Sequence, residues 1–491
     1  MLLSATLGAC AVLPERCAVN APVAHMLFGR GGGTPSEDSV QSRLRVPDGF
    51  ALSVWAEGVD GARFLRFTPR GDLLVSQPRR SRVVLLEADE NGDGRSDGLR
   101  PLVEGLNRPH GLDLHDGWLY LGETDAVARV RFDPSSRSIS GSPERVVTGL
   151  PAGGNHWTRT VRFGPDGGLY VSVGSSCNVC EEEDPRRAAM LRYEPDGSGE
   201  EIFATGLRNS VGFDWQPGSG HLYATDNGRD LLGDDFPPCE LNRLERGAFY
   251  GWPVANGARV PDPDLGAGEE QRIAASRPPA HGFPAHTAPL GMTFVRGPES
   301  RGAYRDAALV ALHGSWNRTR KSGYKVVSLH WRADGTIEER DFATGFEVDE
   351  DVIGRPVDVA EGPDGAFYVS DDYAGVIWRI GRGAASDAAL LPTAGGAAQG
   401  TPPQDEPTGA LRQERRARGA ELYEAHRCYG CHEARRAEPG AVAAPLAGLG
   451  SRLSLGQIVD RLATPTPPMP LYPFDDEQRR DLAVYLQERF D

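Results

Sequence analysis

The chain has 491 residues, a formal net charge of −16, 61 glycines and 38 prolines. This length predicts more than one domain, and the acidic balance argues against nucleic acid or a polybasic membrane patch as partners. No apolar run approaches the ~18 residues of a membrane-spanning helix, whereas the many glycines and prolines fit short strands joined by tight turns.

Residues 1–44 are interpreted as a leader. The segment MLLSATLGACAVL is apolar, but no Lys or Arg precedes it, as a complete secretory signal would require. LGAC (7–10) resembles a bacterial lipoprotein box, which predicts a lipid anchor at Cys10 and a true start further upstream. The alternative is an unstructured leader.

The middle of the chain repeats one pattern, in which an apolar pair, a turn with Pro, Asp or Gly, and an alternating strand follow one another. The copies are LRFTPRGDLLVSQ (65–77), GLDLHDGWLYLGE (111–123), VRFGPDGGLYVSVG (161–174), VGFDWQPGSGHLYATDNG (211–228), the weaker MTFVRGPESRGAYRDAALVALHG (292–314) and VAEGPDGAFYVSDD (359–372). The turns supply the φ > 0 residue that a tight hairpin needs, and alternation at period two is typical of half-buried strands.

Six copies spaced at this length, each worth about four strands, predict an all-β, six-bladed β-propeller over residues 45–383. An insertion occupies about 229–290. FALSVWAEG (50–58) and GVIWRIGRG (375–383) stand at the two ends of the repeats and are expected to close the ring by sharing a blade. A pair of β-sandwiches is the alternative, but it does not explain the recurring turn.

An acidic loop, DENGDGRSD (89–97), interrupts the first repeat. Its oxygen-bearing side chains surround Gly94 and match the first part of an EF-hand loop: Asp89, Asn91, Asp93 and Asp97. The twelfth position is Arg100, where a bidentate Glu is needed. The loop therefore predicts either a structural calcium site or an acidic turn between strands. GDD (233–235) with Glu240 is a second acidic cluster, open to the same two readings.

After residue 383 the composition changes. Residues 384–413 are rich in Ala, Gly, Pro and Thr and are predicted to be a flexible linker. Helical patterns then fill 414–491, which predicts a small all-α domain. They include DDEQRRDLAVYLQERF (475–490), with an acidic first turn that favours the helix dipole.

The helical region contains CYGCHE (428–433). Cys-x-x-Cys-His is the attachment sequence for c-type haem, with thioethers at Cys428 and Cys431 and His432 as an axial ligand. Met469, in the proline-rich TPTPPMPLYPF, is the expected second ligand. The region 415–491 resembles class I cytochrome c. The alternatives are a structural cysteine pair and a packed methionine. Haem attachment of this type predicts export from the cytoplasm.

Cys177 and Cys180 form a second Cys-x-x-Cys, but Glu181 follows where haem would need His. In an exported protein a local disulfide is the first expectation. Cys17 and Cys239 remain, either paired or free.

Several segments in the repeat region resemble a quinoprotein family that includes soluble aldose, sorbosone and pyranose dehydrogenases. They are GGNHWTRTVRFGPDGGLYVSVGSSCNVC (153–180), GLRNSVGFDW (206–215), TDNGRDLLGDDFPPCELN (225–242), YGWP (250–253), HGSWNRT (313–319) and GRPVDV (354–359). The resemblance covers about 45–383 and implies a six-bladed propeller that binds pyrroloquinoline quinone.

The resemblance implies roles for individual residues. His156 matches the general base, and Asn155 stands where relatives carry an Asp that orients it. The expected ligands of the quinone and its carboxylates are Arg208, Asn209, Arg355, Arg63, His313 and Asn317. The carbonyls of Gly228 and Arg229 match the ligands of a calcium ion that polarises the quinone. His110, Arg159 and His286 are candidates for the sugar pocket. Outside the resemblance, each isolated His or Arg would read as structural or solvated.

These observations together predict an exported quinohaemoprotein sugar dehydrogenase, periplasmic or at the outer surface of the inner membrane. An aldose or sorbosone-like sugar would lose a proton to His156, and electrons would pass through the haem to a soluble cytochrome or a membrane oxidase. A propeller that binds a glycan or protein without quinone is the rival prediction. A calcium-dependent lactonase-type propeller ranks third, because it would not need a haem.

Overall fold

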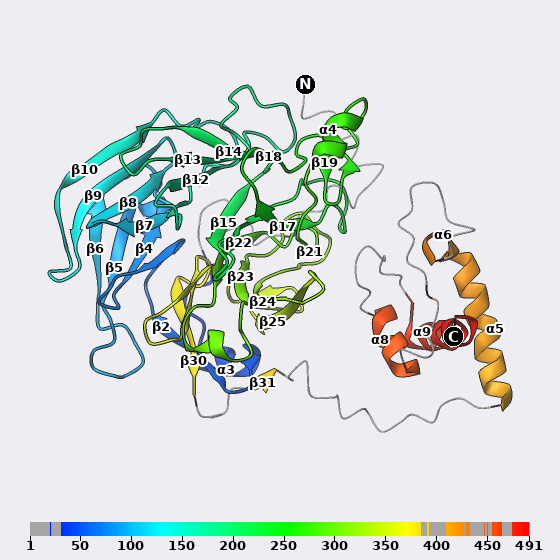
Figure 1. Cartoon of the computed structure of the whole chain (residues 1–491). Coiled ribbons are helices and arrows are strands. Elements are labelled where there is room, and N and C mark those ends of the chain that lie inside the picture. The colour runs from blue at the N-terminus through cyan, green and yellow to red at the C-terminus, as the bar shows by residue number, and fades with distance from the viewer. Residues whose placement is uncertain are drawn as a thin grey trace. The chain divides into compact units, whose positions relative to one another are not determined.

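The computed structural model describes Asn20 and residues 31–383, 390–391, 409–426, 428–432, 446, 449, 454–463 and 474–490. The chain divides into two compact units, Met1–Thr393 and Ala394–Asp491 (Figure 1). Each unit is described by itself.

The first unit is a six-bladed β-propeller, as its sequence predicts. Six sheets follow one another along the chain, and four of the strands in each are antiparallel neighbours. Blade 1 comprises β3 (Leu65–Phe67), β4 (Leu73–Gln77), β5 (Arg82–Leu86) and β6 (Leu99–Glu104). Blade 2 comprises β7 (Leu112–His115), β8 (Trp118–Glu123), β9 (Ala126–Asp133) and β10 (Ser138–Thr148). Blade 3 comprises β11 (Val161–Phe163), β12 (Leu169–Val173), β13 (Ala189–Tyr193) and β14 (Glu201–Thr205). Blade 4 comprises β15 (Ser210–Trp215), β16 (Leu222–Asp226), β17 (Cys239–Leu244) and β21 (His281–Phe283). Blade 5 comprises β22 (Pro289–Phe294), β23 (Ala308–Leu312), β24 (Lys325–Trp331) and β25 (Ile337–Ala343). Blade 6 comprises β28 (Pro356–Glu361), β29 (Phe367–Asp371), β30 (Val376–Arg382) and β2 (Phe50–Ala56).

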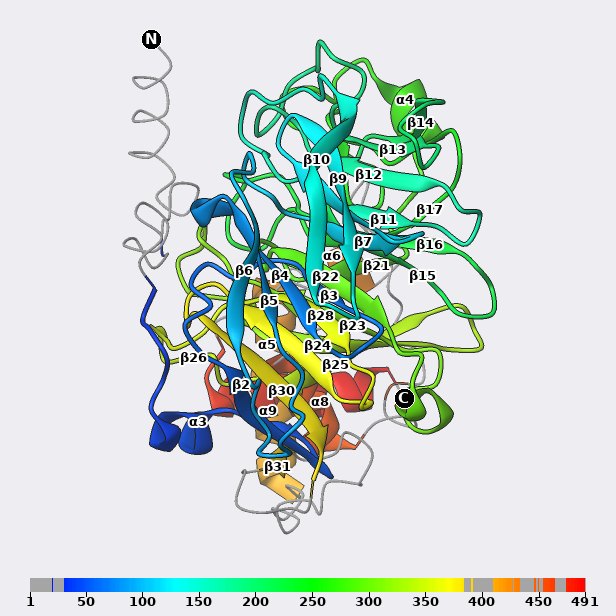
Figure 2. The ribbon, with the colours of Figure 1, turned by 90° about the vertical axis from the view of Figure 1, so that its left-hand side faces the viewer.

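The ring is closed within blade 6. The N-terminal strand β2 pairs antiparallel with β30, with Phe50 opposite Arg382, and Figure 2 shows the blue strand beside the yellow one. This confirms that the two ends of the repeat region share a blade.

The recurring turns have the backbone that their residues predict. Gly167 and Gly365, the glycines of the PDG turns in two of the repeats, have φ of 74° and 76°, a region that side-chain-bearing residues rarely adopt. The hairpins therefore place β11 against β12 and β28 against β29.

The core of the propeller consists of six apolar clusters, one between each pair of neighbouring blades. Each buries one face of two sheets, as the packing of sheet on sheet requires. A smaller cluster lies on the axis and combines buried residues from blades 1, 4, 5 and 6, namely Phe64, Val211, Leu290 and Val357. We call these four residues the axial plug.

Two cavities adjoin the axial plug. One, of about 300 Å³, is lined by Val211 and Leu290 and is called the site cavity below. The other, of about 780 Å³, is lined by Phe64 and by residues of the six innermost strands, and is called the axial cavity. Charged side chains from five of these strands line the axial cavity: Arg66, Asp113, Arg162, Asp214 and Asp358.

The predicted insertion falls between β17 and β21. It contains β18 (Ala248–Phe249), which joins blade 3 beside β14, and β19 (Ala255–Asn256), β20 (Val260–Pro261) and α4 (Glu270–Ala275). Five further elements lie outside the blades: α3 (Glu37–Arg43), β26 (Glu347–Val348), β27 (Asp351–Val352), and β1 (Val46–Pro47), which runs parallel to β31 (Leu390–Leu391).

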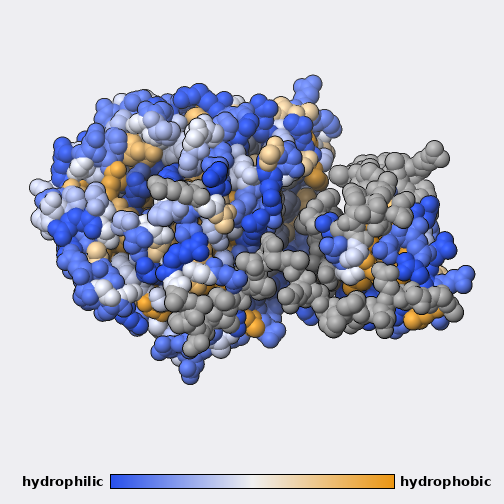
Figure 3. Space-filling view, turned by 60° about the horizontal axis from the view of Figure 1, so that its bottom comes forward, coloured by the Kyte–Doolittle hydropathy of each residue, from blue (hydrophilic) through white to orange (hydrophobic). Residues whose placement is uncertain are grey.

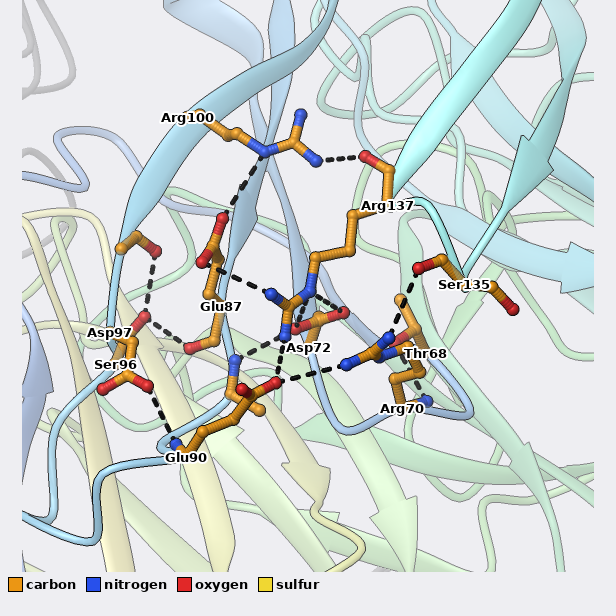
Figure 4. A network of polar contacts seen from close by, with 12 residues as sticks. Thr68, Arg70, Asp72, Glu87, Glu90, Ser96, Asp97, Arg100, Ser135 and Arg137 are labelled. Atoms are coloured by element: carbon orange, nitrogen blue, oxygen red, sulfur yellow. Dashed lines mark hydrogen bonds and ion pairs between the residues drawn. The ribbon is translucent and has the colours of Figure 1, made fainter.

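A polar network joins blades 1 and 2 at their edges (Figure 4). Arg137, in the β9–β10 turn, pairs with the fully buried Asp72 at 3.0 Å and with Glu90 at 2.6 Å. Arg100 contacts Glu87 and donates to the carbonyl of Arg137. Polar side chains predominate on the face drawn in Figure 3, and hydrophobic side chains form small separate areas there.

The described residues of the second unit form helices, as predicted. They are α5 (Gly409–Ala425), α6 (Tyr429–His432), α8 (Leu455–Ala463) and α9 (Asp476–Arg489). Asp475 caps α9 by accepting from the backbone N–H of Gln478. Tyr423, Cys428, Ile458 and Leu482 belong to one buried apolar cluster. Across the described parts of the chain, none of the helices has the length and apolar character needed to cross a bilayer.

Candidate active site

The site cavity collects polar residues from several blades. In an antiparallel blade the start of the innermost strand and the end of the second strand lie at the same edge of the sheet. Arg63, Asn209 and Arg355 each stand just before or at the start of an innermost strand, and His313 follows β23. Six residues selected from the sequence line this cavity: Arg63, Asn155, His156, Asn209, His313 and Arg355.

His156 lies in the loop between β10 and β11 with its ring half-buried. Its Nδ1 is 2.9 Å from both the carbonyl oxygen and the hydroxyl oxygen of Ser175. Because a carbonyl only accepts, Nδ1 carries the proton, and Nε2 keeps a free lone pair. Burial, followed by the charge of Arg208, lowers the pKa of His156 to about 3. The imidazole is therefore neutral, with Nε2 unprotonated.

Two arginines hold the loop that carries His156. Arg159, fully buried, donates to the carbonyls of His156 at 3.0 Å and Thr158 at 2.6 Å. Arg187 donates to the carbonyl of Gly174 at 3.2 Å and also reaches the loop at Gly153. Burial, followed by the charge of Arg187, lowers the pKa of Arg159 to about 9. These guanidinium groups fix the loop and add positive charge beside His156.

Two residues that line the site cavity have buried polar atoms without partners. Asn209 Oδ1 and Arg63 Nε are buried without a hydrogen-bond partner among the described residues. A Cβ added to Gly174 would lie 2.6 Å from both Asn209 Oδ1 and the Cβ of His156. This glycine therefore permits a close approach between the two side chains.

Basic groups surround Asp372 at one side of the site cavity. Arg63 lies 2.9 Å from one carboxylate oxygen, and His313 Nε2 lies 2.9 Å from the other. Burial lowers the pKa of His313 to about 3, with a further contribution from Arg355. Burial opposes ionisation of Asp372, but His313 and Arg63 hold its pKa well below the usual range. Arg355 donates to the carbonyls of His313 and Gly314 and has no carboxylate partner among the described residues.

Arg208 lies outside the site cavity, although its neighbour Asn209 lines it. The buried guanidinium of Arg208 donates to Asn178, to the carbonyl of Gly228 at 2.8 Å and to Asp230 at 2.8 Å. Asn178 stands between Cys177 and Cys180, which form a disulfide as predicted. Ser175, just before this disulfide, is the partner of His156. One short loop thus positions both the imidazole and Arg208.

A third, small cavity of about 20 Å³ is lined by Gly228 and Arg229 together with Asp226 and Glu240. The two carboxyl groups come from opposite residues of β16 and β17. Burial raises the pKa of Glu240 to about 7, and burial and the neighbouring Glu240 raise that of Asp226 well above its usual range. The Arg229 side chain contacts Asp262 at 2.5 Å. Carboxylate and carbonyl oxygens are the ligands that calcium prefers, and this space fits one water or ion.

Other sequence candidates lie away from the site cavity. His110 is fully buried, packs on Phe64 with ring centroids 4.4 Å apart, and has an unpartnered Nε2 among the described residues. Asn317 Oδ1 accepts from the backbone N–H of Leu231 at 2.8 Å. His286 Nε2 is 2.8 Å from the carbonyl of Gly233. Cys239 is a buried free thiol, and Cys10 and Cys17 lie outside the described residues.

The loop at 89–97 is closed by its own side chains. Asp89 accepts from the backbone N–H of Gly92 at 2.7 Å and of Gly94 at 2.9 Å. Asn91 donates to Asp97 at 2.6 Å. Asp93 accepts from the N–H of Arg95 at 2.9 Å. Calcium binding by these four side chains stays a prediction.

The haem candidates lie partly within the described residues. Cys428 is buried in the apolar cluster of the second unit, and the N–H of His432 donates to the Cys428 carbonyl at 3.1 Å. The backbone of Cys431 belongs to α6 between them. Met469 lies outside the described residues.

Ser175 and Asp372 were not found by sequence reasoning. A hydroxyl or carbonyl partner of a histidine leaves no pattern in one sequence. Asp372 directly follows β29, the same position that His313 has after β23. Aligning the repeats would therefore have indicated Asp372 as a candidate site residue.

Comparison with known proteins places these residues in a family. The family model described as TrAA12-like matches residues 44–237 and 268–383. An uncharacterised protein of Borreliella burgdorferi is 28% identical over 363 residues, which cover 71% of this chain and 93% of that protein. The pyrroloquinoline quinone-dependent pyranose dehydrogenase of Coprinopsis cinerea is 25% identical over 345 residues, or 60% of this chain, and the match spans 46% of that enzyme's length.

Solved structures share the propeller fold. The holo form of the pyranose dehydrogenase PQQ domain from Coprinopsis cinerea superposes with a TM-score of 0.60 at 24% identity, covering 72% of this chain and all of that domain. A calcium structure of the Trichoderma reesei family AA12 protein gives a TM-score of 0.61 at 21% identity, covering 70% of this chain and 97% of that one. Since the family model spans well over half of the sequence, the chain belongs to the TrAA12-like family.

Proposed function

We propose that the propeller is a sugar dehydrogenase that binds pyrroloquinoline quinone in the site cavity. The observation that carries this proposal is the convergence of six sequence-selected residues on one cavity beside the propeller axis. The names of the pyranose dehydrogenase relative and of the holo PQQ domain support it. Bound, the quinone would take the hydride that leaves the sugar carbon.

The residues present fit a flat molecule that carries several carboxylates. Arg355 has no carboxylate partner among the described residues, and Arg63 shares Asp372 with His313. Asn209 Oδ1 and Arg63 Nε are buried and unsatisfied, which costs free energy unless a bound group pairs with them. Arginine is suited to planar, bidentate recognition of carboxylates. These three residues are therefore proposed to hold the cofactor.

His156 is proposed as the general base. Its neutral ring, with Nε2 unprotonated, would accept the hydroxyl proton of the sugar while Ser175 holds Nδ1. Asn155, next to it at the cavity, would orient the sugar or the imidazole. Calcium is proposed at the carbonyls of Gly228 and Arg229, where Asp226 and Glu240 supply the nearest carboxyl groups.

The second unit is proposed to be a cytochrome c domain that receives electrons from the propeller and passes them to an external acceptor, a soluble cytochrome or a membrane oxidase. The support is the Cys-x-x-Cys-His sequence, with Cys428 in an apolar cluster and His432 one turn later. A linker between donor and acceptor raises their effective concentration. Export is proposed as well, because haem attachment at a Cys-x-x-Cys-His sequence would take place outside the cytoplasm, and the Cys177–Cys180 disulfide is consistent with an oxidising compartment.

The decisive experiment follows the visible spectrum of the anaerobic full-length protein. Pyrroloquinoline quinone and calcium are added first, and then neutral aldoses or sorbosone. Reduced haem bands are expected only when both the quinone and a sugar are present. A haem that no sugar reduces, despite quinone bound in a measured stoichiometry, would remove the sugar assignment. Failure to bind the quinone would favour a propeller that binds a glycan or protein without it.

A further inference from the structure

A pair of unpaired arginines stands at the edge of the site cavity. Arg79 lies in the short 3-10 turn Pro78–Arg80 and lines the cavity. Arg108 lies with its guanidinium 4.0 Å from the centre of the ring of Trp157, which also lines the cavity. We call Arg79, Arg108 and Trp157 the cationic rim.

Neither arginine of the rim is balanced by a neighbouring carboxylate. The chain has 69 acidic and 53 basic residues, and most described arginines lie within 4.0 Å of a carboxylate. Arg80, the next residue, pairs with Asp60 at 2.5 Å. Neither Arg79 nor Arg108 has such a partner among the described residues. Partial burial, followed by the charge of Arg79, lowers the pKa of Arg108.

The backbone also holds this arrangement against its own preference. Arg108 has φ of 52°, and Ser81, which ends the turn that carries Arg79, also has φ of 52°. Residues with side chains adopt this left-handed region at a cost, and such positions concentrate at functional sites. The face of Trp157 fixes the guanidinium of Arg108 by a cation–π contact. This contact holds the cation of Arg108 beside the cavity that Arg79 also lines, an arrangement that suits a bound anion.

The position of the rim identifies the molecule that carries this anion. Trp157 directly follows His156, so the rim borders the general base. Arg63, Asn209 and Arg355, which are proposed to hold the quinone, line the same cavity. A sugar whose hydroxyl reaches His156 would place the rest of its ring near Trp157. A carboxylate on that ring would then meet Arg79 and Arg108, and charge-assisted contacts to arginine are among the strongest polar contacts in proteins.

We propose that the cationic rim is a subsite for a carboxylated sugar, so that the enzyme prefers uronic acids, free or at the end of an acidic oligosaccharide, over neutral aldoses. This inference rests on the proposed function for the reaction, but the binding of the acidic sugar is independent of it. The positive rim would also steer anionic substrates to the site at low salt.

The test compares matched sugars on the full-length protein with quinone and calcium bound. D-glucuronate is paired with D-glucose, and D-galacturonate with D-galactose. Arg79→Gln and Arg108→Gln are each expected to lower kcat/KM for the uronates roughly tenfold or more and to change it for the neutral sugars by less than about twofold. Arg80→Gln removes the same charge one residue away, at a paired position outside the cavity, and is expected to leave both unchanged.

Three further measurements decide the interpretation. Calorimetry with D-glucuronate is expected to show binding that Arg79→Gln or Arg108→Gln weakens and that higher salt weakens further. If calorimetry shows this binding but no sugar is oxidised, the subsite stands and the proposed reaction fails. A quinone titration is expected to give similar affinities for all variants. If the affinity for quinone falls instead, and kcat/KM falls equally for uronates and neutral sugars, the rim binds the cofactor's carboxylates and the inference is overturned. Absence of uronate binding to the unsubstituted protein overturns it as well.

Discussion

Asp358 provides a sharp test of the charge arrangement in the axial cavity. The residue is 5% exposed, and its carboxyl accepts from the backbone N–H of Leu65 at 2.9 Å. The other two axial aspartates have arginine partners, since Arg66 lies 2.7 Å from Asp113 and Arg296 lies 2.7 Å from Asp214. Asp358 has no ion pair among the described residues, and burial raises its pKa to about 7.

The magnitude follows from the difference between this value and the ordinary pKa of about 3.9 for aspartate. That difference corresponds to an ionisation cost on the order of 4 kcal/mol in the folded protein. The unfolded chain releases the proton near pH 4, whereas the folded protein keeps it until about pH 7. The stability that Asp358 contributes is therefore present below pH 4 and is lost as the pH rises to 7.

The substitution Asp358→Asn keeps the shape and the acceptor for Leu65 but cannot ionise. Relative to the unsubstituted protein, it is expected to gain stability on going from pH 4.5 to pH 8, by an amount on the order of 2 to 4 kcal/mol. Urea unfolding followed by tryptophan fluorescence measures this difference. All eight tryptophans lie between residues 55 and 378, so the signal reports the propeller alone.

Asp214→Asn is the matched control in the same cavity. Burial opposes ionisation of Asp214, but Arg162 and Arg296 outweigh burial and lower its pKa. Its contribution is thus present at neutral pH and is lost as the pH falls, so Asp214→Asn should destabilise more at pH 8 than at pH 4.5. If the free energy difference for Asp358→Asn is the same at both pH values, Asp358 is ionised in the folded protein and the reasoning is refuted.

Three other substitutions test the site cavity. His156→Gln is expected to lower sugar turnover by about 100-fold or more while quinone affinity stays within about threefold, and a loss of quinone affinity alone would argue for a cofactor ligand instead of a base. Gly174→Ala would push a methyl group against Asn209 and His156, so it is expected to lower both turnover and quinone affinity with little change in melting temperature; unchanged kinetics would show that the two side chains can separate freely. Replacing both disulfide cysteines, by Cys177→Ser with Cys180→Ser, is expected to cost about 2 kcal/mol of propeller stability, because the disulfide closes only a short loop. The double substitution is also expected to weaken quinone binding, since Asn178 in this loop holds Arg208. Calorimetry with the quinone measures whether binding is weakened.

The fold could be predicted from the sequence because each blade repeats the same local sequence pattern. A Pro, Asp or Gly turn between alternating strands specifies one hairpin, and six copies specify the ring. Arg63, Asn209 and Arg355 were selected through the resemblance to the quinoprotein family, and the fold brings them together because the start of each innermost strand lies at one edge of its blade.

Other parts of the site depend on contacts that one sequence does not encode. Ser175 positions His156 through a carbonyl and a hydroxyl, which most residue types and many serines could supply. Arg208 was selected as a cofactor ligand, yet its guanidinium is occupied by Asn178, Asp230 and backbone carbonyls. His110 was selected for a sugar pocket and lies fully buried beside Phe64. The contacts of these three residues depend on the direction in which each side chain leaves its loop. Loops have no periodic pattern from which that direction could be predicted.

The closure of blade 6 by β2 has a consequence for how this protein can evolve. In an open repeat array, a duplicated repeat adds length at one end and leaves earlier sites unchanged. Here each blade has two neighbours, and the residues of the site cavity come from the rims of several blades around one axis. A seventh blade would widen the circle and move Arg63, His156 and Arg355 apart together. New specificity is therefore expected to arise in the loops at the cavity's edge, where Arg79 and Arg108 stand, while the number of blades stays fixed.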